Sequence, residues 1–260
     1  MTPHLDLSWR LVVDDEPRSG AANMALDHAL AQLLLPDGGV LRFYRWSSPT
    51  ISFGRNEPTR GRYDRVRAER EGIAFVRRPT GGRAVLHARE VTYCAVLPIR
   101  ALGGLRSTYL RVNQGLVEGL RRLGAQAEIA REGAVLSPDG GPCFRAPTIG
   151  EVTLGGRKLV GSSQARVAGA ILQHGSVILR GDQSALVRMA GGLDDPYPPA
   201  TLDESTGGVA WADVATELAA GLRVALGGCW KQGGYESREI CAAEQLVADR
   251  YATDSWTWRR

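Results

Sequence analysis

Short apolar runs separated by turn residues dominate the first hundred residues of the chain. Each run is rich in Val, Ile, Phe or Tyr and has the length of a single strand. The same pattern returns after a long loop in the second half of the chain. It predicts strands over residues 9–14, 40–46, 50–54, 73–77, 83–87, 91–97, 151–154, 158–163 and 170–179.

Apolar residues near helical spacing predict the helices. Met24, Leu30 and Leu34 mark a helix over residues 20–35, which Pro36 should end. Mixed strands with helices at the start, middle and end predict an α+β (α/β) fold, in which a mixed β-sheet is flanked by helices. We expect one domain over residues 1–260, with a helical C-terminal part from about residue 183. The other predicted helices cover residues 109–123, 183–191, 209–226 and 237–251.

The composition is that of an ordinary soluble globular protein. Hydrophobic residues make up 43% of the 260 residues and charged residues 23%. No apolar run approaches the roughly 20 residues of a membrane helix. The N-terminus lacks the basic start and apolar core of a secretory signal. We therefore expect a cytoplasmic location and no membrane partner.

Charge and cysteine spacing narrow the range of partners. The net charge is +4, with a sequence isoelectric point of about 9.0, which suits an acidic partner or carrier protein. Basic residues form no long block and do not interleave with aromatic residues, so nucleic acid is not expected. Cys94, Cys143, Cys229 and Cys241 form no C-x-x-C pair and have no His at metal spacing. Free thiols and no metal site are therefore expected.

Lysine is rare in this chain, since only Lys158 and Lys231 are lysines among the 32 Lys and Arg residues. Lys158 lies in an apolar, glycine-flanked run over residues 154–164. Arginine is effectively always protonated, whereas a desolvated lysine can give up its proton. Lys158 is therefore a candidate catalytic residue. The alternative is a surface lysine in an arginine-biased chain.

Cys143 is the candidate partner of Lys158. It lies in a Gly/Pro-rich stretch over residues 133–147, which predicts a loop. A reactive thiol needs a lowered pKa, which a nearby cation such as Lys158 provides. As a neutral amine, Lys158 could instead take a proton from the thiol or from an attacking amine. The alternative is a cysteine that packs as a small hydrophobic residue.

A basic turn forms a second candidate site. Gly81 and Gly82 permit left-handed backbone and close approach of a ligand. Arg77, Arg78 and Arg83 flank the two glycines with positive charge. This combination fits a phosphate, a carboxylate or a phosphopantetheine arm. A basic hairpin turn would use the same glycines.

Two later strands carry polar residues among apolar ones. His174 is a candidate general base because its ordinary pKa lies near neutrality, although a strand histidine that orients a loop or lines a pocket is the favoured interpretation. His87 has the same two interpretations. Ser162, Ser163 and Gln164 are candidates for hydrogen bonds to a ligand. The sequence contains neither the G-x-S-x-G motif of serine hydrolases nor a P-loop.

Together these segments resemble the biotin/lipoate protein ligase superfamily over about residues 20–179. Residues 77–82 are similar to its Arg-Arg-x-Ser/Thr-Gly-Gly signature, and residues 156–164 are similar to its lysine strand. Within the superfamily, the chain resembles the LipM-type octanoyltransferases. Arg83 replaces the third glycine of the ATP-using ligases, and segments 86–93, 142–147 and 173–176 are similar to the octanoyltransferase form. Ala88 and residues 148–150 depart from that pattern.

The resemblance implies a biotin/lipoate protein ligase-like catalytic domain and a two-step acyl transfer. Cys143 would attack the thioester of octanoyl–acyl carrier protein and carry the octanoyl group itself. A lysine of a lipoyl-accepting protein, such as the glycine cleavage H protein, would then take the group with the help of Lys158. Transfer from thioester to amide runs downhill, so the resemblance implies no ATP, metal or other cofactor beyond the phosphopantetheine of the donor.

The resemblance also implies where substrate binds. Val85, Leu86, Val160 and Ile171 are candidates to line an apolar tunnel for the acyl chain, and the three arginines suit the phosphate of the acidic carrier. Backbone N–H groups near the glycine turn or around Gly161 are candidates for the oxyanion site. The expected substrate-binding residues are Arg77, Arg78, Gly81, Gly82, Arg83, His87, Gly161, Ser162, Ser163, Gln164, His174 and Gly175.

Three alternatives share parts of this pattern. An ATP-dependent lipoate–protein ligase has the same fold and would not require Cys143. An amidotransferase would move the octanoyl group between two lipoyl-domain proteins, also through a cysteine. A non-catalytic module that binds a carrier protein or nucleic acid would leave Cys143 and Lys158 paired only by coincidence.

Overall fold

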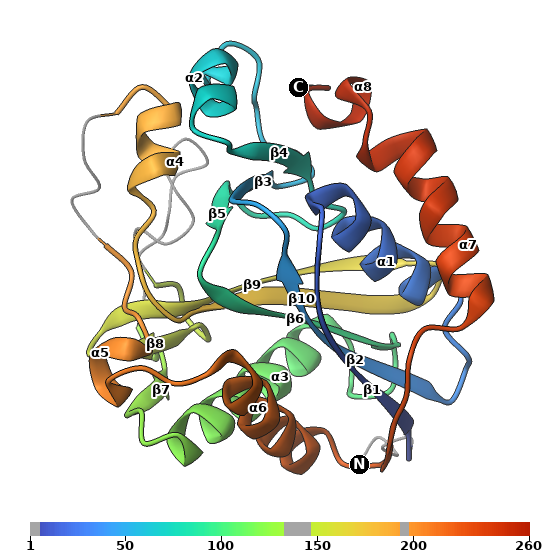
Figure 1. The fold of residues 1–260 in the computed structure, drawn as a ribbon. Coiled ribbons are helices and arrows are strands. Elements are labelled where there is room, and N and C mark those ends of the chain that lie inside the picture. The colour runs from blue at the N-terminus through green and yellow to red at the C-terminus, as the bar shows by residue number, and fades with distance from the viewer. Residues whose placement is uncertain (1–5, 133–146, 193–197) are drawn as a thin grey trace.

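A mixed sheet of eight strands forms the centre of the molecule (Figure 1). The computed structural model describes residues 6–132, 147–192 and 198–260. The strand order is β11-β1-β2-β6-β10-β9-β8-β7. β1 runs parallel to β2 and β11, whereas the pairs from β2 to β7 are antiparallel. The strands are β1 Ser8–Arg18, β2 Gly38–Trp46, β6 Glu90–Pro98, β7 Ala127–Ile129, β8 Val152–Leu154, β9 Arg157–Val167, β10 Ala170–Ile178 and β11 Cys229–Gln232.

A second sheet of three strands lies above the first in Figure 1. Its central strand β3 (Thr50–Phe53) runs parallel to β4 (Ala74–Arg77) and antiparallel to β5 (Val85–His87). The short helices α2 (Arg65–Arg70) and α4 (Ser184–Met189) pack beside it around a small apolar cluster. The turn that connects β4 to β5 contains both Gly81 and Gly82, so the second sheet positions the glycine turn.

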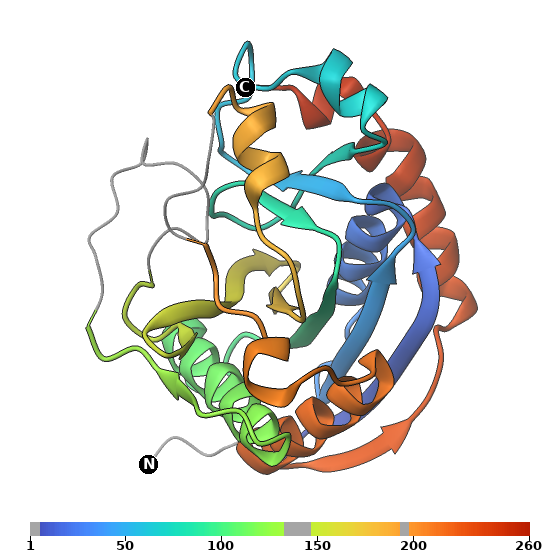
Figure 2. The same cartoon turned by 60° about the vertical axis from the view of Figure 1, so that its left-hand side comes forward.

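Alternation of side chains gives the large sheet two apolar faces. On β2, Leu41 and Phe43 belong to one core cluster, whereas Val40 and Tyr44 belong to another. Helices α3 and α6 cover the first face, and α1 and α7 cover the second (Figure 2). We call these the α3 face and the α1 face. The remaining helices are α1 Gly20–Gln32, α3 Leu105–Arg122, α5 Asp203–Thr206, α6 Trp211–Leu226, α7 Ser237–Leu246, the π-helix η1 Val247–Tyr251 and α8 Asp254–Thr257.

Glycines set how closely α3 and α6 pack. A Cβ atom on Gly221 would lie 2.3 Å from the carbonyl oxygen of Gly115, and one on Gly119 would lie 2.6 Å from that of Glu217. Only glycine permits this approach of two helix backbones. The C-terminal helices are therefore attached to both faces of the sheet, α6 through α3 and α7 through α1.

The predicted fold class and most predicted elements are confirmed. Each predicted strand and helix is present within the described residues, with ends that move by a few residues. Five short elements were not predicted, namely α2, β7, α5, β11 and α8. The loop predicted over residues 133–147 lies almost entirely outside the described residues. Within the described ranges, no helix has both the length and the apolar character of a membrane span.

Candidate active site

Lys158 is buried on the α1 face of β9, with 2% of its surface exposed. Its placement depends on an irregularity in β9. Val152 pairs with Val160, but the next partner of β8, Thr153, pairs with Lys158, so Leu159 is an extra residue in β9. Leu159 and Val160 both belong to the core of the α3 face. The bulge therefore turns Lys158 to the opposite face.

Glu151 holds the lysine in place. Lys158 Nζ lies 2.6 Å from Glu151 Oε1, and the glutamate is 6% exposed. The other carboxylate oxygen, Oε2, accepts the backbone N–H of Thr148 at 2.8 Å. A buried ammonium requires such a partner, because burial of an isolated charge is costly.

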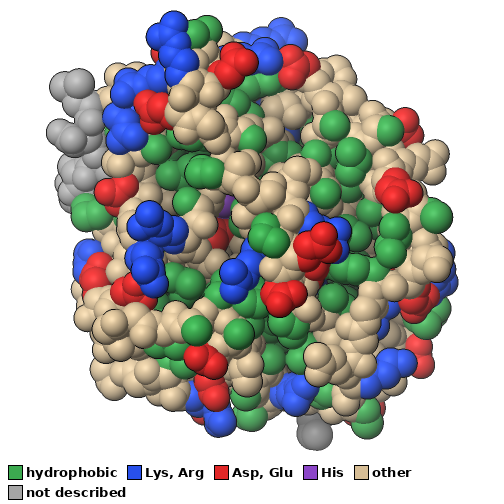
Figure 3. Space-filling view, viewed as in Figure 1, with side chains coloured by type: hydrophobic (Ala, Val, Ile, Leu, Met, Phe, Trp, Pro, Cys, Tyr) green, Lys and Arg blue, Asp and Glu red, His purple; other side chains and the backbone are tan. Residues whose placement is uncertain are grey.

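A cavity lies on the α1 face between the two sheets. It holds about 410 Å³ of empty space, part of which is open to solvent. Figure 3 shows a hollow on this side of the molecule, with a histidine at its base and Lys and Arg side chains around its rim. Its lining combines apolar side chains with polar ones, as is common in ligand sites. The lining residues are Met24, Tyr44, Trp46, Arg78, Gly82, Val85, His87, Thr92, Gly161, Ser162, Ser163, His174, Gly175 and Ser176.

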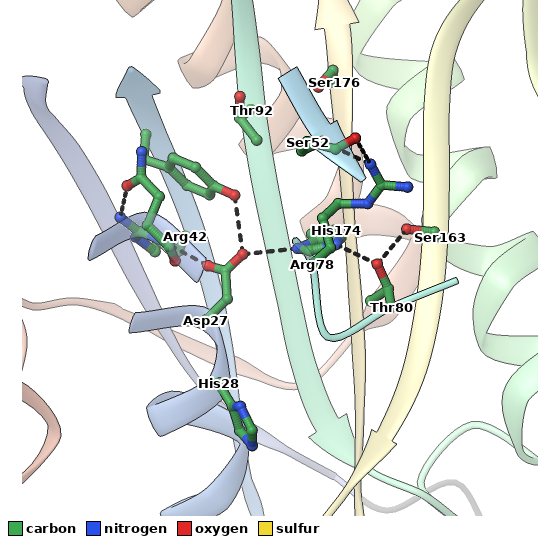
Figure 4. A network of polar contacts seen from close by, with 12 residues as sticks. Asp27, His28, Arg42, Ser52, Arg78, Thr80, Thr92, Ser163, His174 and Ser176 are labelled. Carbon is green, nitrogen blue, oxygen red and sulfur yellow. Dashed lines mark hydrogen bonds and ion pairs between the residues drawn. The ribbon is translucent and has the colours of Figure 1, made fainter. Parts of the chain in front are cut away.

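His174 lies at the centre of a chain of hydrogen bonds behind this cavity (Figure 4). Its Nδ1 is 2.9 Å from Asp27 Oδ2, and its Nε2 is 2.7 Å from Thr80 Oγ1. Ser163 donates to Thr80 Oγ1 at 2.8 Å. The pattern fits a neutral imidazole that donates to Asp27 and accepts from Thr80.

Charges around Asp27 agree with that assignment. Burial alone would raise the pKa of the Asp27 carboxyl, but His174 and Arg42 outweigh it, so the pKa lies below its usual range. Arg42 donates to Asp27 Oδ1 at 2.8 Å, and Tyr44 donates to Oδ2 at 3.0 Å. Burial lowers the pKa of His174 despite the nearby carboxylate, so the imidazole is neutral at pH 7. Because Thr80 occupies its Nε2, His174 positions the glycine turn and is not an open general base.

His87 organises a second network on the other side of the cavity. Its Nδ1 is 2.7 Å from Glu90 Oε1, its Nε2 is 2.6 Å from Ser52 Oγ, and its ring stacks on Trp46 at 4.0 Å. Ser176 also donates to Glu90 Oε1, at 2.7 Å. Both ring nitrogens therefore have partners, and His87 forms a rigid wall of the cavity.

The glycine turn is folded around Arg78. Its guanidinium donates to the carbonyl oxygens of Ser52, Gly81 and Arg83 at 2.7, 3.0 and 2.9 Å. Gly82 has a φ of 88°, a conformation that favours glycine, and it lines the cavity. Arg78 also lines the cavity, but two of its contacts maintain the turn and a third joins the turn to β3.

Arg77 does not reach the cavity, contrary to the expectation that it binds substrate. It is fully buried on the far side of the turn. Its guanidinium donates to the carbonyl oxygens of Gly54, Glu57 and Thr257 at 2.7, 2.9 and 2.9 Å. Neighbouring residues on a strand point in opposite directions, so Arg77 and Arg78 cannot serve one site. Arg77 instead ties β4 to the C-terminal segment.

The three polar residues predicted on β9 divide between the two faces. Ser163 lies on the α1 face beside Thr80, as expected. The hydroxyl of Ser162 is 2.7 Å from that of Tyr93, and Gln164 donates to Gln173 at 2.7 Å, so both side chains point to the α3 face. Ser162 reaches the cavity lining, but the placement of Gln164 does not support contact with a ligand there.

Gly161 and Gly175 bring two strand backbones together beneath the cavity. A Cβ atom on Gly175 would lie 2.4 Å from the carbonyl oxygen of Gly161. Both glycines line the cavity, so a ligand there would meet backbone rather than side chains.

Of the proposed tunnel residues, only Val85 lines the cavity. Val160 and Ile171 belong to the core of the α3 face, and Leu86 belongs to the apolar cluster between the small sheet and helices α2 and α4. These three residues therefore do not line this cavity. Met24 and Trp46 provide apolar lining that the sequence analysis did not identify.

Cys143 lies outside the described residues. The other cysteines are free thiols: Cys94 is buried, and Cys229 and Cys241 are exposed. Burial raises the pKa of the Cys94 thiol well above its ordinary value, which makes this cysteine a poor nucleophile. Within the described part of the chain, His, Cys, Asp and Glu side chains form no group that could hold a metal ion.

Two carboxylates that organise this site, Asp27 and Glu151, were not among the residues predicted from the sequence. Asp27 is the one acidic residue in the buried stretch of α1, and it is fully buried. Glu151 stands directly before an apolar strand. A carboxylate in an apolar segment indicates a buried ion pair or hydrogen-bond network, because a buried charge needs a partner. The partners themselves, Arg42 and Lys158, are basic residues in equally apolar strands.

A known protein family matches the part of the chain that contains these site residues. Residues 19–198 match the lipoyl protein ligase A/B catalytic domain. The octanoyltransferase LipM of Symbiobacterium thermophilum is 36% identical, over 98% of this chain and all of that protein. The octanoyltransferase LipM of Kyrpidia tusciae is 38% identical, over 97% of this chain and 99% of that protein.

Solved structures support the fold assignment. A lipoate–protein ligase A crystallised with ATP superimposes with a TM-score of 0.81, covering 97% of this chain and 99% of that chain. At 23% identity, that likeness concerns the fold alone. The sequence matches span the full chain and include both the glycine turn and the lysine strand. The chain therefore belongs to the lipoyl protein ligase A/B catalytic domain family and, within it, to the LipM octanoyltransferases.

Proposed function

We propose that this octanoyltransferase takes the octanoyl group from octanoyl–acyl carrier protein and passes it to a lysine of a lipoyl-accepting protein through Cys143. The observation that carries the proposal is the buried Lys158–Glu151 pair, whose lysine lies on the same strand as the cavity residues Gly161 and Ser163, in a chain that aligns end to end with LipM octanoyltransferases. A buried lysine contributes little to solubility, and its amine can gain or lose a proton, so Lys158 is suited to proton transfer.

The first step is acylation of the enzyme. The Cys143 thiolate attacks the carbonyl carbon of the donor thioester, and the S–C bond to phosphopantetheine breaks. The leaving thiolate takes a proton from the Lys158 ammonium, which leaves Lys158 neutral for the second step, and the octanoyl group remains on Cys143 as a thioester. Met24, Trp46 and Val85 provide apolar surface for the chain, at about 0.8 kcal/mol for each buried methylene.

The second step is transfer to the acceptor. The ε-amine of the acceptor lysine attacks the acyl-cysteine, an amide forms, and the Cys143 thiolate leaves. Lys158 takes the proton that the amine loses, and Glu151 stabilises the resulting ammonium. One thioester replaces another and then yields an amide, so the cycle consumes no ATP.

Gly175 pairs with β6 on one side and β9 on the other, so its backbone N–H is used within the sheet. The N–H groups of the glycine turn, where Gly82 lines the cavity, are therefore the candidates to stabilise the oxyanion of both steps. Backbone donors of this kind stabilise a developing negative charge.

A test uses intact-protein mass spectrometry. The enzyme is mixed with octanoyl–acyl carrier protein without ATP, and one octanoyl group should appear on the protein. Cys143→Ala should remain unmodified, and the isolated acyl-enzyme should transfer its group to a lipoyl domain. Replacing the donor by an octanoylated lipoyl domain tests the amidotransferase alternative. Full acylation of Cys143→Ala, or a strict need for ATP, would overturn the proposal.

A further inference from the structure

A second hollow lies at the other end of β9, away from Lys158. It encloses about 590 Å³ of space, part of which is open to solvent. We call it the arginine pocket, because three arginines and no acidic residue line it. Its residues are His28, Gln32, Arg55, Pro79, Arg166, Val167, Ala168, Arg250 and Trp256.

No Asp or Glu side chain of the described residues neutralises the positive charge in this pocket. Within the described residues, Arg55, Arg166 and Arg250 form no salt bridge with Asp or Glu, and neither does the adjacent Arg259. Arg250 and Arg259 both contact the ring of Trp256, at 4.8 and 4.1 Å from its centroid. Stacking on the indole holds these two guanidinium groups in place without neutralising them.

The arginines lie within each other's electrostatic field. Burial lowers the pKa of His28 to about 4, and the charges of Arg250 and Arg55 contribute to the shift. Burial also lowers the pKa of the Arg259 guanidinium, with Arg55 the next contributor. The buried Arg42, by contrast, has the carboxylate of Asp27 beside it. A cluster without one favours an anion from outside the chain.

Two segments of the chain extend from the arginine pocket to the active-site cavity. Pro79 lines the pocket, and the next residue, Thr80, bonds to His174 behind the cavity. On β9, Ser163 lines the cavity and Val167 lines the pocket. Four residues of strand span about 13 Å. His28 points away from the His174 network, toward the pocket (Figure 4).

We propose that the arginine pocket binds the phosphate of the donor's phosphopantetheine arm, an inference that rests on the proposed function. Roughly twelve bonds separate the phosphate oxygen from the sulfur of that arm, as many as in four residues of extended chain, or about 14 Å. A phosphate among Arg55, Arg250 and Arg259 would place the thioester at the cavity. Guanidinium groups suit this role because they bind phosphate in a bidentate manner.

This assignment differs from the one made from the sequence, which named Arg77, Arg78 and Arg83, because none of these three residues lines the arginine pocket. Arg77 is fully buried and donates to backbone carbonyls, and Arg78 uses its guanidinium to hold the glycine turn. By contrast, the side chain of Arg55 is exposed at the rim of the pocket.

The test compares small donors that differ only in the phosphate, so no carrier-protein surface contributes. The rate of Cys143 acylation is measured by mass spectrometry with octanoyl-phosphopantetheine and with octanoyl-pantetheine. The wild-type enzyme should favour the phosphorylated donor by about tenfold to 100-fold in kcat/KM, as expected for charged hydrogen bonds. Arg55→Gln and Arg250→Gln should each reduce this preference and together abolish it, with an unchanged rate for octanoyl-pantetheine.

Arg223→Gln is the matched control, because Arg223 is an exposed arginine that stacks on the remote Trp230. It should keep the full phosphate preference. Arg55→Gln changes an exposed side chain, so its result does not depend on the stability of the Trp256 stack. An undiminished preference in the double variant, or no preference in the wild type, would overturn the inference. Absence of acylation by any donor, carrier-bound ones included, would instead contradict the proposed function.

Discussion

Lys158 and Glu151 form a buried ion pair across the turn between β8 and β9, with Nζ and Oε1 2.6 Å apart. The pair links three parts of the site. Lys158 belongs to the bulged strand, Glu151 precedes β8, and the second oxygen of Glu151 binds the backbone of Thr148, five residues after Cys143 in sequence. One carboxylate thus fixes the lysine and anchors the chain that follows the proposed nucleophile.

Glu151→Gln should therefore reduce both stability and transfer. Removing one partner from a buried ion pair costs about 3 kcal/mol, and we expect a loss of that order in the free energy of unfolding measured with urea. The pH profile of acyl transfer should also move to lower pH, because the ammonium form loses its compensating carboxylate. A merely structural role would lower stability without moving the profile.

A double-mutant cycle with Lys158→Met measures the pair directly. The double variant should recover part of the stability lost by Glu151→Gln, with a coupling energy of about 1–3 kcal/mol. Strict additivity of the two single changes would show that the pair contributes nothing.

Lys158→Arg separates charge from proton transfer. Arginine retains the positive charge but cannot act as a base at neutral pH. Transfer from isolated acyl-enzyme to a lipoyl domain should slow by about 100-fold to 10,000-fold, the range for loss of a general base. Lys231→Arg is the natural control, since Lys231 is the other lysine of the chain and is exposed. Near-normal transfer by Lys158→Arg would show that Lys158 acts only through its positive charge.

The two glycines of the turn should respond differently to alanine. Gly82 has a φ of 88°, and a Cβ there would meet Arg78 Nη2 at 3.2 Å, so Gly82→Ala should destabilise the protein by about 1–2 kcal/mol. A Cβ on Gly81 meets no atom within 4 Å. Gly81→Ala should keep the melting temperature and slow acylation if substrate approaches that backbone. An equal loss of melting temperature in both variants would contradict this distinction.

Sequence patterns predicted the strands and helices well because both depend on local periodicity. They could not predict which face Lys158 occupies. Lys158 and Ser163 are five residues apart, and regular alternation would place them on opposite faces. The extra residue at Leu159 brings both to the α1 face, and no local pattern signals such a bulge. Arg77 and Arg78 pose the same difficulty, since only tertiary packing decides which of two adjacent arginines points to the cavity.

Contacts between residues far apart in the sequence could not be predicted either. Asp27 and His174 are 147 residues apart in sequence, and their contact exists only because α1 packs on β10. The short strands β7 and β11 escaped prediction for a related reason. Each has three or four residues and is stabilised by its neighbour in the sheet rather than by its own composition.

His28 should make the protein less stable in mild acid. Its pKa is lowered from 6.5 to about 4, chiefly by burial, so the unfolded chain binds a proton that the folded protein does not bind between these values. The free energy of unfolding therefore falls as pH decreases from about 6.5, by about 2 kcal/mol at pH 5. His28→Gln removes this contribution, and its stability curve should be flatter than that of the wild type. Urea unfolding at pH 7.5, 6 and 5 measures the difference. His174, whose pKa is also lowered, affects both proteins equally and cancels in the comparison. Parallel curves for the two proteins would mean that His28 takes up its proton with little cost to the fold.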